Sequence, residues 1–282
     1  MEFQDRYRQA QTPEYDCLLF DLDDTLYPLS SGLAVACRNN IEGYMVEKLG
    51  IDKSKIPVMC NLLYKYYGTT MAGLRAVGYD FDHDDYHSYV HGRLPYENLK
   101  PDPVLRNLLL SLPLHKVIFT NGDKIHAAKV LSRLGLEDCF EGIICFETLN
   151  PRQDPPQEPS KTQIFDIIDY FSKPNASSGD LPKTPIRCKP SEAAIEEALK
   201  IANIDPNRTI FFDDSLRNIQ AGKLVGLHTV LVGTSHRLKG ADFALESIHN
   251  IRQALPELWE DEEKCEGVRY SGKPAMETSV TA

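Results

Sequence analysis

The feature that most constrains this chain is a short apolar run that ends in acids. Residues 17–20 read Cys-Leu-Leu-Phe, and Asp21, Asp23 and Asp24 follow within four positions. An apolar run of this length is typical of a buried parallel strand. Alternate positions on an extended chain share a side, so Asp21 and Asp23 are expected to point the same way. Neighbouring carboxylates repel one another unless a cation or a proton lies between them, and the motif therefore predicts a divalent metal. Asp24 is interpreted as a turn or capping residue.

Composition limits the classes of partner. The 282 residues are 42% hydrophobic and 26% charged, as in an ordinary globular protein, and the net charge is −10. Without a basic stripe, nucleic acid and anionic membrane surfaces are poor partners. No apolar run approaches the roughly 18 residues of a membrane span, and the first residues lack the apolar core of a signal peptide. Seven scattered cysteines without a Cys-x-x-Cys pair indicate reduced thiols. We therefore expect a cytoplasmic location, with the nucleus as an alternative.

Further apolar runs indicate a sheet. The expected strands after the first are residues 116–120, 142–146, 208–212 and 228–232. Helical patterns with apolar positions three or four residues apart lie between them, for example from Ile125 to Leu134 and from Ser215 to Val225. Strands that alternate with helices predict an α/β fold with a doubly wound parallel sheet. We assign residues 1–27 and 101–255 to this core.

The interval between the first two strands predicts an inserted domain. Thr120 lies 99 residues after Asp21, whereas a parallel crossover needs only a dozen or more. The interval reads as helices, so residues 28–100 are expected to form a small all-helical domain. A proline-rich stretch, 151–188, is interpreted as an exposed insertion whose one amphipathic helix docks on the core. Residues 256–282 are expected to be an unstructured tail.

Three histidines in the helical domain allow two interpretations. His83, His87 and His91 are four residues apart and would share one face of a helix. They could bind a metal together with a nearby carboxylate. No further cluster of ligands accompanies them, so a polar helix face is favoured.

Polar residues also follow the later strands. Thr120 and Asn121 end the second, and Asp213 and Asp214 end the fourth. Lys189 precedes Pro190 and a predicted helix, a place where a helix N-terminus and a lysine together favour an anion. Open α/β sheets bind ligands at the carboxyl ends of their strands. We therefore expect these groups to meet Asp21 and Asp23 in one site.

These motifs resemble those of the haloacid dehalogenase (HAD) superfamily. The match consists of Asp-x-Asp-x-Thr-Leu after a first strand, Thr after a second, Lys before a helix and Asp-Asp after a fourth, and it covers about residues 15–235. The helical insertion is similar to the cap domain of that superfamily, and the core would have its Rossmann-like fold. More narrowly, residues 20–28, 119–122 and 211–219 look like the pyrimidine 5′-nucleotidase branch of suppressor-of-disruption and related plant proteins.

The resemblance implies a Mg²⁺-dependent phosphatase, a hydrolase that works through an aspartyl-phosphate. It implies that Asp21 is the nucleophile, Asp23 the general acid and base, and Lys189 the group that offsets their charge. Thr120 and the amide of Asn121 would bind the phosphoryl oxygens. The metal would be held by Asp21, the backbone carbonyl of Asp23, and Asp214. Asp213 would act indirectly, by contacting these ligands or through a water molecule.

The substrate is expected to be a small phosphorylated metabolite, and the narrow resemblance favours a nucleoside monophosphate such as UMP or CMP. Pyridoxal phosphate, sugar phosphates and lysophosphatidate remain alternatives. The residues proposed from position alone to select the substrate are Tyr27, Ser31, Arg38 and Arg93. Two other classes also stay open, a phosphomutase and a regulatory binding protein without catalysis.

Overall fold

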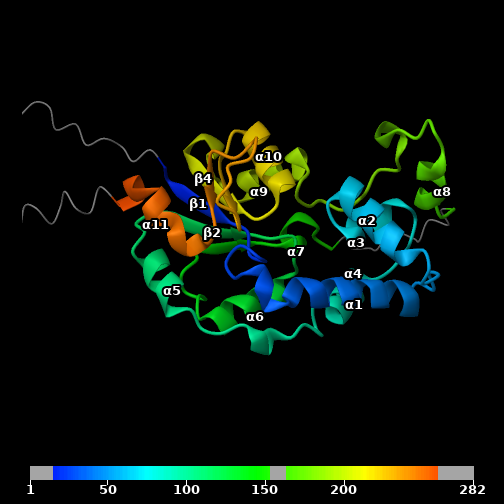
Figure 1. Ribbon diagram of the computed structural model, residues 1–282, viewed down its shortest axis with the longest axis horizontal. Coiled ribbons are helices and arrows are strands. Elements are labelled where there is room, and N and C mark those ends of the chain that lie inside the picture. Colours follow the sequence, from blue (N-terminus) through cyan, green and yellow to red (C-terminus); the bar gives the residue numbers. More distant parts are fainter. Residues whose placement is uncertain (1–14, 153–162, 260–282) are drawn as a thin grey trace, which may run out of the picture.

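The computed structural model describes residues 15–152 and 163–259. Its centre is one parallel sheet with the strand order β3-β2-β1-β4-β5-β6. The strands are β1 (Cys17–Phe20), β2 (His115–Phe119), β3 (Gly142–Ile144), β4 (Thr209–Asp213), β5 (His228–Val232) and β6 (Phe243–Leu245). Helices connect the strands and cover both faces (Figure 1). The α/β prediction with a doubly wound parallel sheet is thereby confirmed.

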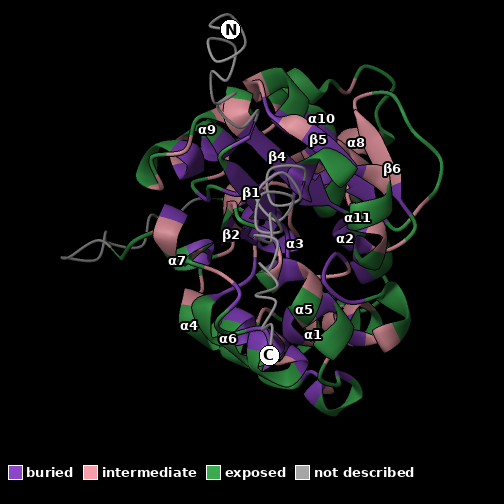
Figure 2. Ribbon diagram, turned by 90° about the vertical axis from the view of Figure 1, so that its left-hand side faces the viewer, coloured by how far each residue is buried: buried purple, intermediate pink, exposed green. Residues whose placement is uncertain are grey.

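The alternation of side chains along β1 explains the two layers of helices. Leu18 and Phe20 pack in one hydrophobic cluster and Leu19 packs in another, because successive strand residues face opposite sides. All three are fully buried, as the purple centre of Figure 2 shows. The first cluster is covered by α5 (Pro103–Leu110), α6 (Lys124–Leu134) and α11 (Ile251–Ala254). The second is covered by α7 (Phe146–Leu149), α9 (Glu192–Ile201) and α10 (Leu216–Val225).

Four further helices, which we call the helical module, lie between β1 and α5 in the sequence. They are α1 (Leu33–Glu47), α2 (Ile56–Tyr67), α3 (Thr70–Ala76) and α4 (His83–Val90). The module has its own hydrophobic cluster, which includes Tyr44, Leu63 and Leu74. Its connections to the sheet belong to the core instead, since Leu33 and Tyr96 pack with the sheet residues. The module therefore stands beside the sheet as a second packed unit (Figure 1).

The helix of the proline-rich stretch does not dock where the sequence suggested. Helix α8 (Ile167–Ser172) packs against α2 of the module and not against the sheet, and Ile167 belongs to the module's cluster (Figure 1). The rings of Tyr66 and Phe171 stack with centroids 4.5 Å apart. The backbone N–H of Phe165 donates to the carbonyl of Val77. The amphipathic pattern correctly indicated a buried face, but it carries no information about which surface that face covers. Residues 153–162 lie outside the described residues.

Three smaller differences from the expected elements concern the end of β3, the additional strand β6 and the expected tail. Strand β3 is two residues shorter than expected because Cys145 caps α7. Strand β6 has only three residues, too few for a period to be read, and the sequence did not indicate it. Residues 256–259 are not part of an unstructured tail: Trp259 is buried and its indole N–H donates to Ser111. Residues 260–282 lie outside the described part. Within the described ranges, every helix is too short or too polar to cross a membrane.

Candidate active site

The carboxyl ends of the three central strands bring the predicted polar groups together. The register pairs Phe20 of β1 with Ile118 of β2 and with Phe212 of β4. Asp21 and Asp213 therefore emerge next to one another, and Thr120 emerges one strand away. The backbone N–H of Asp21 donates to the carbonyl of Phe212, which extends the ladder by one residue into the site.

Lys189 is the cation of this cluster. Its ammonium group is 2.7 Å from each of three oxygens, Oδ1 of Asp21, Oδ2 of Asp213 and the carbonyl oxygen of Phe119. The side chain is 1% exposed. Asn121 holds the backbone of Lys189 from both sides, since its amide donates to the carbonyl and its oxygen accepts from the N–H. The three donors of the ammonium are satisfied, and the lysine is fixed as a positive charge beneath Asp21.

The carboxylates outnumber this one cation. One oxygen from each of Asp21, Asp213 and Asp214 lies within 4.8 Å of the other two. Burial raises the pKa of Asp21 well above its usual value, against the pull of Lys189 and with the support of the neighbouring acids. Burial and Asp213 likewise raise the pKa of Asp214 to about 7. The cluster therefore holds more negative charge than Lys189 can offset.

This surplus fits a magnesium ion. The oxygens lie close enough together for one ion to contact more than one of them, and carboxylate oxygens are ligands that Mg²⁺ would accept. Asp213 is already occupied, because its two oxygens accept from Lys189, from the backbone of Ser215 and from Asn218. Asp214 is accessible at the rim of the cluster, although the groups packed around its carboxyl still raise its pKa. Oδ2 of Asp21 accepts only a longer hydrogen bond, 3.2 Å from the Thr25 hydroxyl. This oxygen and Asp214 are accordingly the better placed ligands, while Asp213 shares Lys189 with Asp21.

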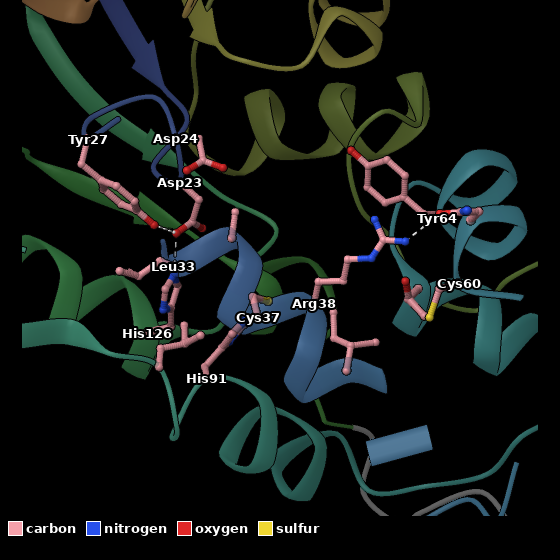
Figure 3. Close-up of a pocket in the computed structure, with 15 residues that line it drawn as sticks. Asp23, Asp24, Tyr27, Leu33, Cys37, Arg38, Cys60, Tyr64, His91 and His126 are labelled. Atoms are coloured by element: carbon pink, nitrogen blue, oxygen red, sulfur yellow. Dashed lines mark hydrogen bonds and ion pairs between the residues drawn. The ribbon is translucent and has the colours of Figure 1, made fainter. Parts of the chain in front are cut away.

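Asp23 is held by two side chains. Its Oδ1 accepts a hydrogen bond of 2.5 Å from the Tyr27 hydroxyl and lies 2.7 Å from Nε2 of His126 (Figure 3). Burial disfavours the charged form of Asp23, but His126 and Tyr27 outweigh it and lower the pKa of this carboxyl to about 2. The same pairing raises the pKa of His126 although burial opposes it. A dianionic phosphate bound beside Asp23 would act in the opposite direction and favour its protonated form.

The histidines of α4 are not a polar surface, and the favoured interpretation was wrong. His87 is buried, and its ring stacks on that of His91 with centroids 5.5 Å apart. His91 in turn stacks on His126 at 4.5 Å and contacts Oδ2 of Asp123 at 2.5 Å. Phe146 of α7 packs edge-on against the rings of His83 and His87, and the start of α6 meets His91. The spacing of three histidines cannot reveal these contacts.

Two adjoining cavities surround these groups. One, of about 310 Å³, is lined by the strand ends, including Asp21, Thr120 and Lys189. The other, of about 390 Å³, extends from Asp23 between α1 and α2 (Figure 3). Most of its exposed wall area is apolar, although many of the residues also carry polar groups. Besides Asp23, the lining residues are Asp24, Tyr27, Leu33, Ala34, Cys37, Arg38, Ile41, Cys60, Asn61, Tyr64, Thr70, His91, Leu94 and His126. We call the second one the module cavity.

The four residues proposed to select a substrate fall into two groups. Tyr27 and Arg38 line the module cavity, although the Tyr27 hydroxyl is engaged by Asp23. The Arg38 guanidinium donates to Glu42 and Asn61. Ser31 and Arg93 are not in its lining: the Ser31 hydroxyl accepts from the N–H of Leu33, and Arg93 lies 3.6 Å from the ring centroid of Tyr89. Their position in the sequence did not bring Ser31 and Arg93 into the lining of this cavity.

Core and module also touch at the rim of the site. Arg217 of α10 donates to the carbonyls of Tyr64 and Lys65 at the end of α2 and lies over the Tyr64 ring. Gly68, with φ of +87°, lets the chain pass so close to Lys189 that a Cβ would come within 2.5 Å of its carbonyl oxygen. The module therefore sits directly over the strand ends.

Comparison with known proteins finds similarity over parts of the chain. A family model of the haloacid dehalogenase-like hydrolases matches residues 150–226. Phosphate metabolism protein 8 of Saccharomyces cerevisiae is 30% identical over 139 residues, 46% of this chain and 43% of the yeast protein. The chain thus spans less than half of that relative. Glyceraldehyde 3-phosphate phosphatase of Pyrococcus furiosus is 28% identical over 215 residues, 76% of this chain and 78% of that protein.

A solved structure supports the fold. CbbY from Rhodobacter sphaeroides, in complex with phosphate, superposes with a TM-score of 0.50 at 17% identity over 84% of this chain and 96% of its own. The family-model match includes the segment that carries Lys189, Asp213 and Asp214, and the likeness to the solved structure shows a shared fold. The narrower 5′-nucleotidase resemblance is carried by the sequence motifs alone.

Proposed function

We propose that the protein is a Mg²⁺-dependent phosphatase of small phosphomonoesters, with UMP and CMP as its preferred substrates. The observation that carries the proposal is the buried ammonium of Lys189, which joins Asp21 to Asp213 at the strand ends. Burying several charges costs free energy, so a network of this kind is not expected where its only role would be to stabilise the sheet. It fits a site that must bring a carboxylate nucleophile up to a phosphate dianion.

The reaction has two halves. In the first, an Asp21 oxygen attacks phosphorus and the bond to the leaving oxygen breaks, while Asp23 supplies the proton that this oxygen needs. In the second, Asp23 takes a proton from a water molecule as that water attacks the phosphorus, which releases inorganic phosphate and restores Asp21. Lys189 offsets charge on Asp21 and on the phosphoryl group throughout, and Thr120 with the backbone N–H of Asn121 holds the phosphoryl oxygens, since the side-chain amide of Asn121 already holds Lys189.

The metal would be held by Asp21, the carbonyl of Asp23, and Asp214. When bound, Mg²⁺ supplies positive charge to the phosphoryl oxygens and to the crowded carboxylates.

Removal of divalent metal is expected to abolish turnover, and added Mg²⁺ is expected to restore it. The same ion should raise the melting temperature, because it relieves the repulsion among the carboxylates. Thermal unfolding with and without Mg²⁺ tests this independently of activity, and Asp214→Asn should lose most of the shift. Full turnover in excess chelator would contradict the metal assignment.

Asp23→Asn is expected to lower kcat by about 10²–10⁴-fold, the usual worth of a general acid or base. Phosphate should remain on Asp21, because the base for the second half is missing. Intact-mass measurement after an acid quench detects the added phosphoryl group. Asp24→Asn is the neighbouring control: Asp24 has φ of +58°, which Asn adopts readily, so most of the turnover should remain. An unchanged rate in Asp23→Asn would remove Asp23 from this role.

The choice of UMP and CMP rests on the sequence motifs and on the module cavity, whose mostly apolar walls suit a flat ring better than a polyhydroxylated chain. A screen of phosphomonoesters with Mg²⁺ tests it, comparing UMP and CMP with purine nucleotides, sugar phosphates and glyceraldehyde 3-phosphate. The last compound is included because a relative is named for it. A flat profile would leave a phosphatase of broad specificity.

A further inference from the structure

His126 is the group outside the recognised motifs that lies nearest to the proposed chemistry. It comes from the first turn of α6, 103 positions after Asp23, and the two side chains meet at 2.7 Å. Its ring is 2% exposed. The Tyr27 hydroxyl reaches the same oxygen, Oδ1, so both donors occupy one side of the carboxylate (Figure 3). The other oxygen, Oδ2, faces Gly122, since a Cβ built there would lie 3.8 Å from it.

The histidine is itself held firmly. Nδ1 lies 2.8 Å from the Tyr96 hydroxyl, and the backbone N–H of His126 donates to Oδ1 of Asp123, the residue that caps α6. The ring stacks on His91, which contacts the second oxygen of Asp123. When the Tyr96 hydroxyl donates to Nδ1, Nε2 carries the proton and donates to Asp23. Every polar atom of the ring then has a partner, and the ring cannot turn without losing two hydrogen bonds.

We propose that His126 is a positioning residue, which with Tyr27 fixes the Asp23 carboxylate so that only Oδ2 exchanges a proton at the reacting centre. The inference rests on the proposed phosphatase function. An exposed aspartate samples several rotamers, whereas a carboxylate held by two short hydrogen bonds at one oxygen presents the other in a single direction. A displacement of about 1 Å at a reacting group costs roughly 10²-fold in rate.

The residues around His126 come from both the sheet core and the helical module. His126 belongs to the sheet core, but the ring on which it stacks, His91, follows α4 of the module, and Tyr96 lies on the return from the module. The module side therefore contributes one neighbour, the ring of His91, to the surroundings that hold His126 against Asp23.

Two substitutions separate positioning from packing. His126→Leu fills similar space but has no donor, whereas the side-chain amide of His126→Gln can still donate to Asp23. With an alkyl phosphomonoester, His126→Leu is expected to lower kcat by about 10²-fold with little change in KM, because binding of the phosphoryl group does not involve it. His126→Gln should recover most of that loss.

A second readout follows from the leaving group. p-Nitrophenolate leaves with little need of a proton, so His126→Leu should form the aspartyl-phosphate quickly from p-nitrophenyl phosphate and hydrolyse it slowly. Rapid-mixing measurements should then show a burst of p-nitrophenolate equal to the enzyme concentration. A merely structural defect would slow both the formation and the hydrolysis of the aspartyl-phosphate, so that p-nitrophenolate would be released at one reduced rate without a burst.

Val130→Ala is the matched control for stability. Val130 lies one turn further along α6, is fully buried and contacts the core cluster. Its truncation should lower the melting temperature while kcat stays at the wild-type value. If His126→Leu keeps the wild-type kcat, or if His126→Gln is as impaired as His126→Leu, the positioning role is wrong. An inactive wild-type protein would refute the proposed function instead, so the two failures are distinct.

Discussion

Asp21→Asn should leave no measurable phosphatase turnover. The amide nitrogen and oxygen of Asn are poor nucleophiles, so the aspartyl-phosphate cannot form and both halves of the reaction stop. The fold should survive, because Asn keeps the size of Asp21 and its oxygen can still accept from Lys189, which lies 2.7 Å away in the wild type. Turnover of UMP and of p-nitrophenyl phosphate gives the activity, and circular dichroism with thermal unfolding gives the integrity of the fold.

The expected melting temperature of Asp21→Asn is close to the wild-type value without metal, since the substitution also removes one member of a crowded set of acids. Its response to Mg²⁺ should be much smaller. Turnover above a trace, in protein free of contaminating phosphatase, would remove Asp21 from the role of nucleophile.

Lys189→Met is expected to remove activity and to destabilise the protein strongly. Met occupies a similar volume, but Asp21 and Asp213 lose their shared cation in a site that is almost closed to water. Breaking a buried ion pair from one side costs about 3–5 kcal/mol, because the remaining charge is left uncompensated. Urea unfolding monitored by circular dichroism measures this loss.

Lys116 provides a matched control for that experiment. It is also buried, but its ammonium donates only to the carbonyls of Leu112 and Leu114 among the contacts described. Lys116→Met should therefore cost less stability than Lys189→Met and should leave turnover intact. If the two substitutions lowered the free energy of unfolding equally, the ion pairs of Lys189 with Asp21 and Asp213 would not account for the loss.

The parts that could be predicted from sequence are those that local patterns encode. The apolar run before Asp21 and the helical period from Ile125 to Leu134 both correspond to elements of the structure, because burial on one face leaves a period in the chain. The motif order also placed Asp21, Thr120 and Lys189 at one edge of the sheet. Asp21 and Thr120 follow strand ends, which share an edge in a parallel sheet, and Lys189 lies just before α9.

The parts that could not be predicted depend on contacts between distant segments. His126 is a single histidine in a helix, and nothing in its surroundings marks it as a partner of Asp23. One signal was available: it stands in the first turn of the helix that follows Thr120, which starts at the reactive edge of the sheet. Ser31 and Arg93 illustrate the reverse case, where nearness in the sequence to a motif or to the helical domain did not place a side chain in the cavity.

The docking of α8 has a consequence for the exchange of parts between related proteins. Ile167, Ile186 and Cys188, with Phe146 of α7, complete a hydrophobic cluster whose other buried members belong to the module. The Thr184 hydroxyl also donates to the carbonyl of Ala72. A chimera that replaced residues 28–100 alone would leave this segment facing a foreign surface. The unit of recombination that keeps its own interior is discontinuous: it joins the module to residues 163–188, the stretch that leads directly into Lys189.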